Sequence, residues 1–215
     1  MRIPIHPTGW PFIALFLAVN LLLLALSIWA ACAFLPLTLW CVAFFRDPER
    51  RVPEGEGLVV SPADGRLLPL AHAAPPPELG MGPEPRLRLS IFMNVFNVHV
   101  NRMPAGGTVV KLAYRKGRFF NASFDKASEH NERMAIRLRL DGTVKELAVV
   151  QIAGLVARRI RCDLSEGGHI SRGARFGIIR FGSRLDVYLP AGVKVLAEPN
   201  RTVRAGETVL AKLED

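Results

Sequence analysis

The residues with the clearest chemical potential are Gly182 and Ser183, which separate two segments typical of β-strands, Ala174–Phe181 and Arg184–Leu189. No conventional linker joins these segments, so the Gly-Ser pair has to form a tight corner or a bulge. A serine hydroxyl is a weak nucleophile that needs a positioned base. A glycine before it permits a strained backbone and close attack on its own carbonyl. The pattern therefore has two interpretations, a structural corner or a reactive serine.

A base and an acid to assist this serine can be sought among the histidines and aspartates. His99 lies in an apolar segment of β character, where a single histidine is also typical of an ordinary packed side chain. Asp64 lies in Ser61-Pro-Ala-Asp-Gly65, which by itself predicts a turn. Taken singly, these residues leave catalytic and structural roles open.

Taken together, five stretches make the chain resemble the short form of the phosphatidylserine decarboxylase family. They occur in the family's order and lie within residues 46–190: VVSPADG, FNVHVNRMP, GRFFNASFDKASEHNER, QIAGLVARRI and RFGSRLDVYLP. Precursors of this family cut themselves at a Gly-Ser bond. Some members have Leu-Gly-Ser-Thr there, whereas this chain has Phe181-Gly-Ser-Arg184. The reacting pair is retained, and the role of Arg184 is left open.

The resemblance implies a self-cleavage and a cofactor made from the chain itself. Ser183 Oγ would attack the carbonyl of Gly182, and elimination would release residues 1–182 as the β chain. Loss of ammonia would leave a pyruvoyl group on residues 183–215, the α chain. The resemblance assigns His99 as the base and Asp64 as the residue that orients it, which follows the logic of a hydrolase triad. The pyruvoyl group then forms a Schiff base with the substrate amine and accepts electrons as carbon dioxide leaves.

The implied reaction converts phosphatidylserine to phosphatidylethanolamine, although an archaeal ether lipid with the same headgroup fits equally well. Arg102 and Arg133 are the expected anion contacts. Asn121 and Ser123 would add hydrogen bonds, and His130 is a further candidate in the site. The expected partners are the membrane phospholipid, the two cleavage fragments held as a heterodimer, and a second copy in a homodimer. No Cys/His spacing indicates a metal.

The N-terminal segment predicts a membrane anchor within residues 1–45. The segment from Pro11 to Phe45 contains no charged residue. This segment is longer than the ~20 residues that one membrane-spanning helix needs. We therefore expect a transmembrane helical hairpin, broken near Ala30–Pro36. The alternative is a cleaved signal peptide, because Ala31-Cys-Ala33 has the small-x-small pattern of a cleavage site.

The distribution of charge and aromatic residues orients this anchor in the cell membrane. Trp10 and Trp29 would lie at opposite interfaces, and basic residues flank both apolar runs, which puts residues 46–215 on the cytoplasmic side. The net charge of +9 resides almost wholly in that region, because Arg2 is the one charged residue before it. Its Lys and Arg are scattered, which favours anionic lipid over nucleic acid as partner. Three cysteines without a disulfide pattern indicate a reducing compartment.

Residues 46–215 are expected to form one mainly β domain, a sandwich or barrel with a few short helices. Apolar residues alternate from Leu87 to Met93, and Asp141-Gly142 predicts a hairpin turn between Met134–Leu140 and Val144–Val150. A short polar-apolar-polar-x-Gly pattern occurs twice near the C-terminus and resembles lipoyl-carrier barrels. It adds support for an all-β fold.

Two rival functions follow from the same residues. A membrane-anchored serine hydrolase would use Ser183, His99 and Asp64 on an external acyl group, but the chain lacks the Gly-x-Ser-x-Gly elbow. A non-enzymatic carrier module would present Lys194 at a hairpin tip, but that lysine lacks the flanking methionines usual in carriers.

Overall fold

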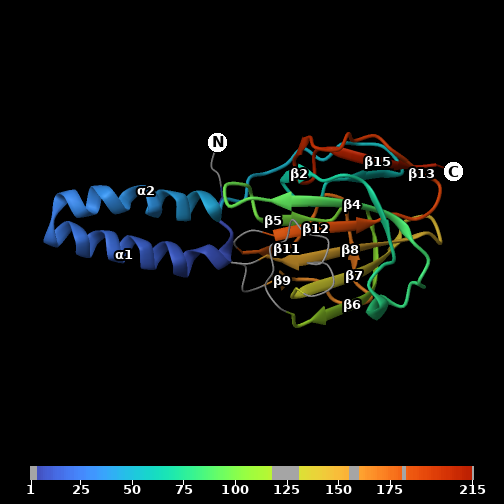
Figure 1. The fold of residues 1–215 in the computed structure, drawn as a ribbon, viewed down its shortest axis with the longest axis horizontal. Coiled ribbons are helices and arrows are strands. Elements are labelled where there is room, and N and C mark those ends of the chain that lie inside the picture. The colour runs from blue at the N-terminus through green and yellow to red at the C-terminus, as the bar shows by residue number, and fades with distance from the viewer. Residues whose placement is uncertain (1–3, 118–130, 155–159, 181–182, 215) are drawn as a thin grey trace. The chain divides into compact units, whose positions relative to one another are not determined.

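The computed structural model describes residues 4–117, 131–154, 160–180 and 183–214. The chain divides into two compact units, Met1–Glu49 with Phe96–Val98 and Arg50–Val95 with His99–Asp215. The first unit is helical and the second is built mainly of strands (Figure 1). The prediction of a mainly β chain with apolar N-terminal helices is confirmed.

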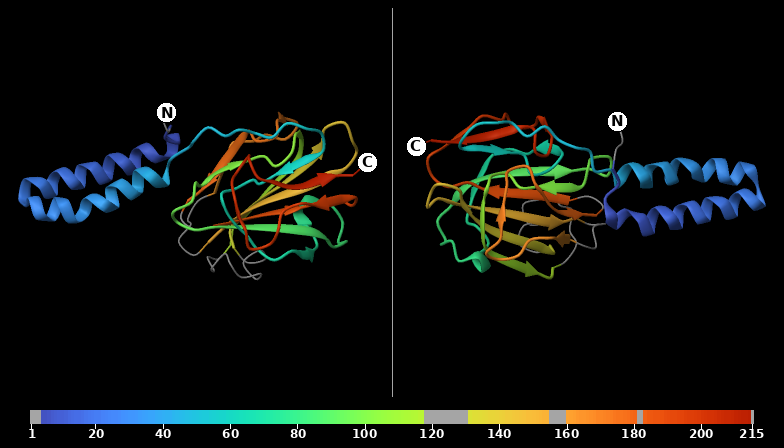
Figure 2. Two further views of the ribbon diagram at one scale, coloured as in Figure 1. Left: turned by 90° about the horizontal axis from the view of Figure 1, so that it is seen from above. Right: turned by 180° about the vertical axis from the view of Figure 1, so that it is seen from behind.

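The helical unit consists of a short 3-10 helix and two α-helices, namely η1 (Pro7–Gly9), α1 (Trp10–Leu26) and α2 (Ile28–Phe44). By length and composition, Pro7–Leu26 could cross a membrane, and Ile28–Phe44 is a shorter apolar helix. The two α-helices run side by side (Figure 2). The Asn20 amide donates to the Ala31 carbonyl at 3.1 Å, and the rings of Phe16 and Phe34 stack at 5.8 Å.

The break between the helices lies at Ser27, so the predicted position near Ala30–Pro36 was wrong. Ser27 has an extended backbone (φ −163°, ψ 127°), and its N–H donates to Leu23 O, which closes the last turn of α1. Serine competes with helical backbone bonds and favours helix ends. Pro36 instead lies inside α2. Proline is tolerated in such apolar helices where local adjustments satisfy the freed backbone groups.

The second unit contains one short 3-10 helix, η2 (Pro77–Leu79), and fifteen strands among the described residues: β1 (Leu58–Val60), β2 (Gly65–Leu67), β3 (Ala71–Ala73), β4 (Arg86–Met93), β5 (Val100–Arg102), β6 (Gly107–Arg115), β7 (Arg133–Leu140), β8 (Glu146–Ala153), β9 (Ile160–Cys162), β10 (His169–Ile170), β11 (Arg175–Ile179), β12 (Ser183–Tyr188), β13 (Val193–Val195), β14 (Thr202–Val203) and β15 (Val209–Leu213). Strand β4 covers the alternating segment Leu87–Met93, and β7 and β8 lie on either side of the predicted Asp141-Gly142 turn. Gly142 (φ +68°) forms the predicted turn between β7 and β8.

These strands pair antiparallel in three sheets. The large sheet has the order β10-β6-β7-β8-β12-β4-β2-β14, with β3 added beside β4. The two smaller sheets have the orders β1-β15-β13 and β5-β11-β9. Strand β12 therefore lies in the middle of the large sheet, between β8 and β4.

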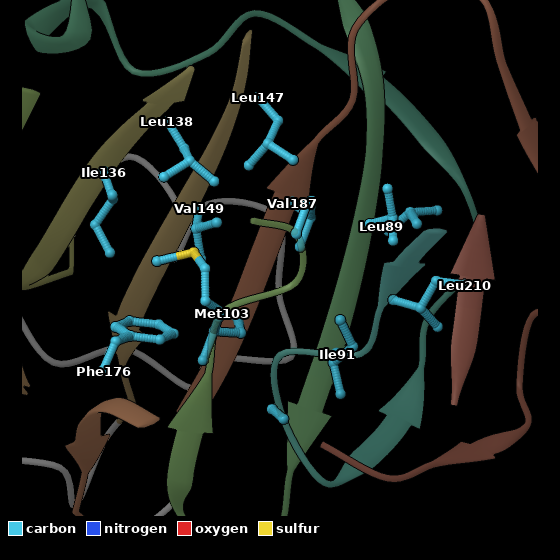
Figure 3. Close-up of a cluster of buried hydrophobic side chains, with 14 of the residues drawn as sticks. Leu89, Ile91, Met103, Ile136, Leu138, Leu147, Val149, Phe176, Val187 and Leu210 are labelled. Carbon is cyan, nitrogen blue, oxygen red and sulfur yellow. The ribbon is translucent and has the colours of Figure 1, made fainter. Parts of the chain in front are cut away.

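One apolar core contains residues from all three sheets (Figure 3). The large sheet contributes Leu89, Ile91, Ile136, Leu138, Leu147, Val149, Leu185 and Val187, and the smaller sheets contribute Phe176, Ile179, Leu210 and Ala211. A second cluster includes Ala148, Val150, Ile152 and Tyr188, packed with Leu79 of η2. Since side chains alternate between the faces of a strand, β8 and β12 are buried on both faces.

Candidate active site

Ser183 is the first residue of β12 and is completely buried. It is held from both sides, because it pairs with Met93 at the end of β4 and with Ala153 at the end of β8. Its hydroxyl lies 3.9 Å from the Met93 sulfur, which is a weak acceptor. The reactive serine predicted from the sequence thus has a rigidly placed backbone and a weakly engaged hydroxyl. Its partner Gly182 lies outside the described residues.

His99 immediately precedes β5 and is also completely buried. Its carbonyl accepts a hydrogen bond from the Ile179 N–H at 3.4 Å. Ile179 ends β11, four residues before Ser183 along the chain. This backbone contact ties the predicted base to the strand that leads into the cleavage segment.

Beside Ser183 lies a chain of buried amide side chains that sequence reasoning missed. The Asn101 amide donates to the Met93 sulfur at 3.7 Å, and Gln151 donates to Asn101 Oδ1 at 2.8 Å. All of these side chains are fully buried. A signal was present in the sequence, since Gln151 is a polar residue within the apolar run of β8. The Met93 sulfur is therefore shared by the Ser183 hydroxyl and this amide chain.

Asp64 lies in the predicted turn, where its carboxylate accepts three hydrogen bonds. Arg50 Nη2 donates to both carboxylate oxygens at 2.9 and 2.7 Å, and the Ala205 N–H donates at 2.8 Å. Arg50 also lies 3.5 Å from Glu207. The sequence indicated Arg50 only as a basic flank of the anchor. Asp64 thus connects Arg50 with Ala205, and Arg50 contacts Glu207 in the same C-terminal segment.

The two predicted anion contacts are both buried and both bonded to protein groups. Arg102 Nη1 donates to Gly173 O at 2.9 Å. A Cβ added at Gly206, which has φ +74°, would lie 3.0 Å from Arg102 Cδ, so the glycine makes room for this arginine. Arg133 forms a two-point pair with Glu78 of η2, with distances of 2.7 and 2.8 Å. The other predicted contacts, Asn121, Ser123 and His130, lie outside the described residues.

Arg184, whose role the sequence left open, forms a buried ion pair on the other face of β12. Its guanidinium lies 2.8 Å from each oxygen of Asp186, at Nε–Oδ1 and Nη2–Oδ2. The two side chains are only 1% and 0% exposed. Burial raises the pKa of the neighbouring Tyr188 phenol, and the Asp186 charge raises it further, while Arg88 opposes both. In the described parts of the chain, no His, Cys, Asp or Glu cluster could hold a metal ion.

Comparison with known proteins gives consistent matches over nearly the whole chain. The family model described as phosphatidylserine decarboxylase matches residues 37–211. Three similar proteins are each named phosphatidylserine decarboxylase proenzyme. The one from Paramagnetospirillum magneticum is 56% identical over 214 residues (98% of this chain and 88% of that protein). That from Cereibacter sphaeroides is 57% identical over 213 residues (98% and 90%), and that from Ruegeria pomeroyi 52% over 214 residues (98% and 96%).

Proposed function

The chain belongs to the phosphatidylserine decarboxylase family, and we propose that it decarboxylates phosphatidylserine with a pyruvoyl group formed from its own Ser183. The observation that carries this proposal is the setting of Ser183, which is fully buried and fixed between β4 and β8 at the junction with β11. A serine whose backbone is fixed by pairing on both sides suits an intramolecular attack, which depends on a held geometry. When formed, the pyruvoyl group supplies the electron sink for loss of carbon dioxide.

Self-cleavage begins with the Ser183 hydroxyl, which we propose transfers its proton to His99 as Oγ attacks the Gly182 carbonyl. The 3.9 Å contact with the Met93 sulfur is a weak hydrogen bond, so the hydroxyl gives it up at little cost. The bond between His99 O and Ile179 N supports this role, because it fixes the histidine backbone against the strand before the cleaved bond. The same histidine would protonate the product after decarboxylation.

Asp64 has a double role in this proposal. It orients and stabilises the charged form of His99, as the resemblance implies. Asp64 also connects the segment at Arg50, before the first strand, with the segment at Ala205, after β14. For the substrate, we propose that Arg102 and Arg133 bind the phosphate and carboxylate, with Asn121, Ser123 and His130 completing the site. Glu78 would then share Arg133 with the incoming anion.

The two fragments, 1–182 and 183–215, are proposed to stay together as a heterodimer after cleavage. Strand β12 of the short fragment pairs with β4 and β8 of the long one along its whole length. Strands β14 and β15 pair with β2 and β1. Leu185, Val187 and Leu210 contribute to the common core. Separation of the fragments would therefore expose both hydrogen-bonding edges and apolar surface.

We propose that residues 1–45 form a transmembrane hairpin, with the β-sandwich of residues 46–215 on the cytoplasmic side of the cell membrane. Large apolar side chains such as Leu26 and Trp29 are 75% and 81% exposed on the helices, which suits a lipid environment. Residues 31–33, the alternative signal-peptide site, lie inside α2.

Intact mass measurement under denaturing conditions tests the proposal. We expect two fragments, one ending at Gly182 and one whose first residue is lighter than serine by one ammonia. The Ser183→Ala variant should stay whole, and the matched control Ser171→Ala should be cleaved normally. A single full-length species from the folded, membrane-bound parent would overturn self-processing. In that case, labelling of Ser183 by a fluorophosphonate would favour the hydrolase.

A further inference from the structure

Phe96 is a large apolar residue at a turn position, where polar or small residues are more common. It lies in the turn between β4 and β5, three residues before His99, and is 71% exposed. Exposed turn tips usually carry small or polar residues. Phe96 is not among the described residues that form the apolar cluster of the sheets. An outward-facing aromatic ring in such a turn points to a contact with an apolar partner.

Arg46 connects this turn to the end of the apolar helices. Its Nη1 donates to the Ala43 carbonyl in the last turn of α2 at 2.6 Å, and its Nη2 donates to the Phe96 carbonyl at 2.8 Å. Residues 96–98 accordingly belong to the same compact unit as the helices. One guanidinium therefore holds Phe96 at the C-terminal end of α2.

That end of the helix pair has the residues of a membrane-water boundary. Trp10 begins α1 and Trp40 lies in the last turns of α2, so both are at this end, whereas Trp29 lies at the other. Indole rings and arginines favour the headgroup layer. This layer is only about 5–7 Å thick on each side of the hydrocarbon core. A single arginine side chain spans such a distance, so a bilayer crossed by these helices would place lipid close to the Phe96 backbone that Arg46 bonds.

We propose that Phe96 inserts into the boundary between headgroups and acyl chains of the bilayer and thereby holds the turn before His99 at the lipid surface. This proposal rests on the membrane anchor proposed above. Its consequence is specific: Phe96 promotes turnover of substrate that resides in a bilayer and contributes nothing to turnover of a dissolved substrate molecule. The headgroup chemistry itself does not involve this ring.

The test compares one enzyme on two physical forms of substrate. Phe96→Ser should raise the apparent Michaelis constant for phosphatidylserine in phosphatidylcholine vesicles by about tenfold, because the ring loses part of the burial of a phenylalanine. Its turnover of monomeric dihexanoyl phosphatidylserine and its self-cleavage should equal those of the parent. Phe96→Trp should restore the vesicle activity. The control Val144→Ser, at a turn residue that is 92% exposed, should behave as the parent.

Three outcomes would overturn the proposal. Equal losses on vesicles and on monomers would make Phe96 part of the catalytic structure. If the parent enzyme floats with vesicles in a density gradient but Phe96→Ser has an unchanged Michaelis constant on vesicles, the role of Phe96 is overturned and the anchor is not. Failure of the parent itself to float would overturn the anchor and this proposal together.

Discussion

The two faces of β12 hold opposite kinds of residue within one strand. On the inner face, Ser183 precedes Leu185 and Val187 of the apolar core, and its hydroxyl lies against a methionine sulfur. On the outer face, Arg184 and Asp186 form a buried two-point ion pair. The Ser183 hydroxyl on the inner face makes only a weak contact, whereas the side chains of the outer face are joined by an ion pair. We therefore expect substitutions on the inner face to test the proposed chemistry and substitutions on the outer face to test stability.

Ser183→Ala should have the largest effect on chemistry and little effect on stability. Without the hydroxyl, self-cleavage and decarboxylation should both be abolished, which gel analysis and carbon dioxide release would measure. The substitution removes one weakly bonded oxygen, so the free energy of unfolding should change by less than about 1 kcal/mol. Residual cleavage in this variant would contradict the assignment. The uncleaved variant also provides a uniform background for the stability measurements below.

Arg184→Met should have the largest effect on stability. Removal of one partner of a buried ion pair costs about 3–5 kcal/mol, because the Asp186 carboxylate stays buried and loses its contact with Arg184. Denaturant unfolding in detergent, with Ser183→Ala as the reference, would measure this loss. The double variant Arg184→Met/Asp186→Leu should recover most of it, because it removes both charges. If the double variant is as unstable as the single one, the pair is not the source of the effect.

Asn101→Leu should slow self-cleavage about tenfold, because the Met93 sulfur that contacts the Ser183 hydroxyl loses its hydrogen bond from Asn101 and is held less firmly. The rate of fragment appearance after cell-free synthesis would measure this. The buried Gln151 amide would lose its acceptor, which costs about 1–3 kcal/mol in stability. Gln151→Met should repair that stability in the double variant without repairing the rate. Cleavage at the parental rate would show that the amide chain serves the fold alone.

The smallest effect concerns Tyr188, whose phenol pKa should be raised by burial and by Asp186 above its usual value of about 10. The chain has two tyrosines, so the variant Tyr114→Phe reports Tyr188 alone in an alkaline absorbance titration. The folded phenol keeps its proton to higher pH than the unfolded one. Stability should therefore fall as the pH rises from about 10 towards the folded pKa. A titration at the ordinary value would mean that this face is open to water.

The sequence by itself determined those features that depend on neighbouring residues. The charge-free run from Pro11 to Phe45 predicts apolar helices, alternation predicts the strand at Leu87–Met93, and Asp141-Gly142 predicts a hairpin turn. The family resemblance predicts Gly182 and Ser183 as the cleavage pair through the motif around them. The position of the helix break was wrong, because Pro36 lies inside α2 and Ser27 ends α1 instead.

Only the tertiary structure decided which distant residues meet. It pairs Asp64 with Arg50 and Ala205, Arg133 with Glu78, and Asn101 with Gln151. Arg184 and Asp186 are only two positions apart, but the sequence does not show that both are buried in the large sheet. Local periodicity indicates which face of a strand is apolar, but not which strand lies beside it. Strand order places β12 between β4 and β8, and that order is set by burial summed over the whole domain rather than by any segment alone.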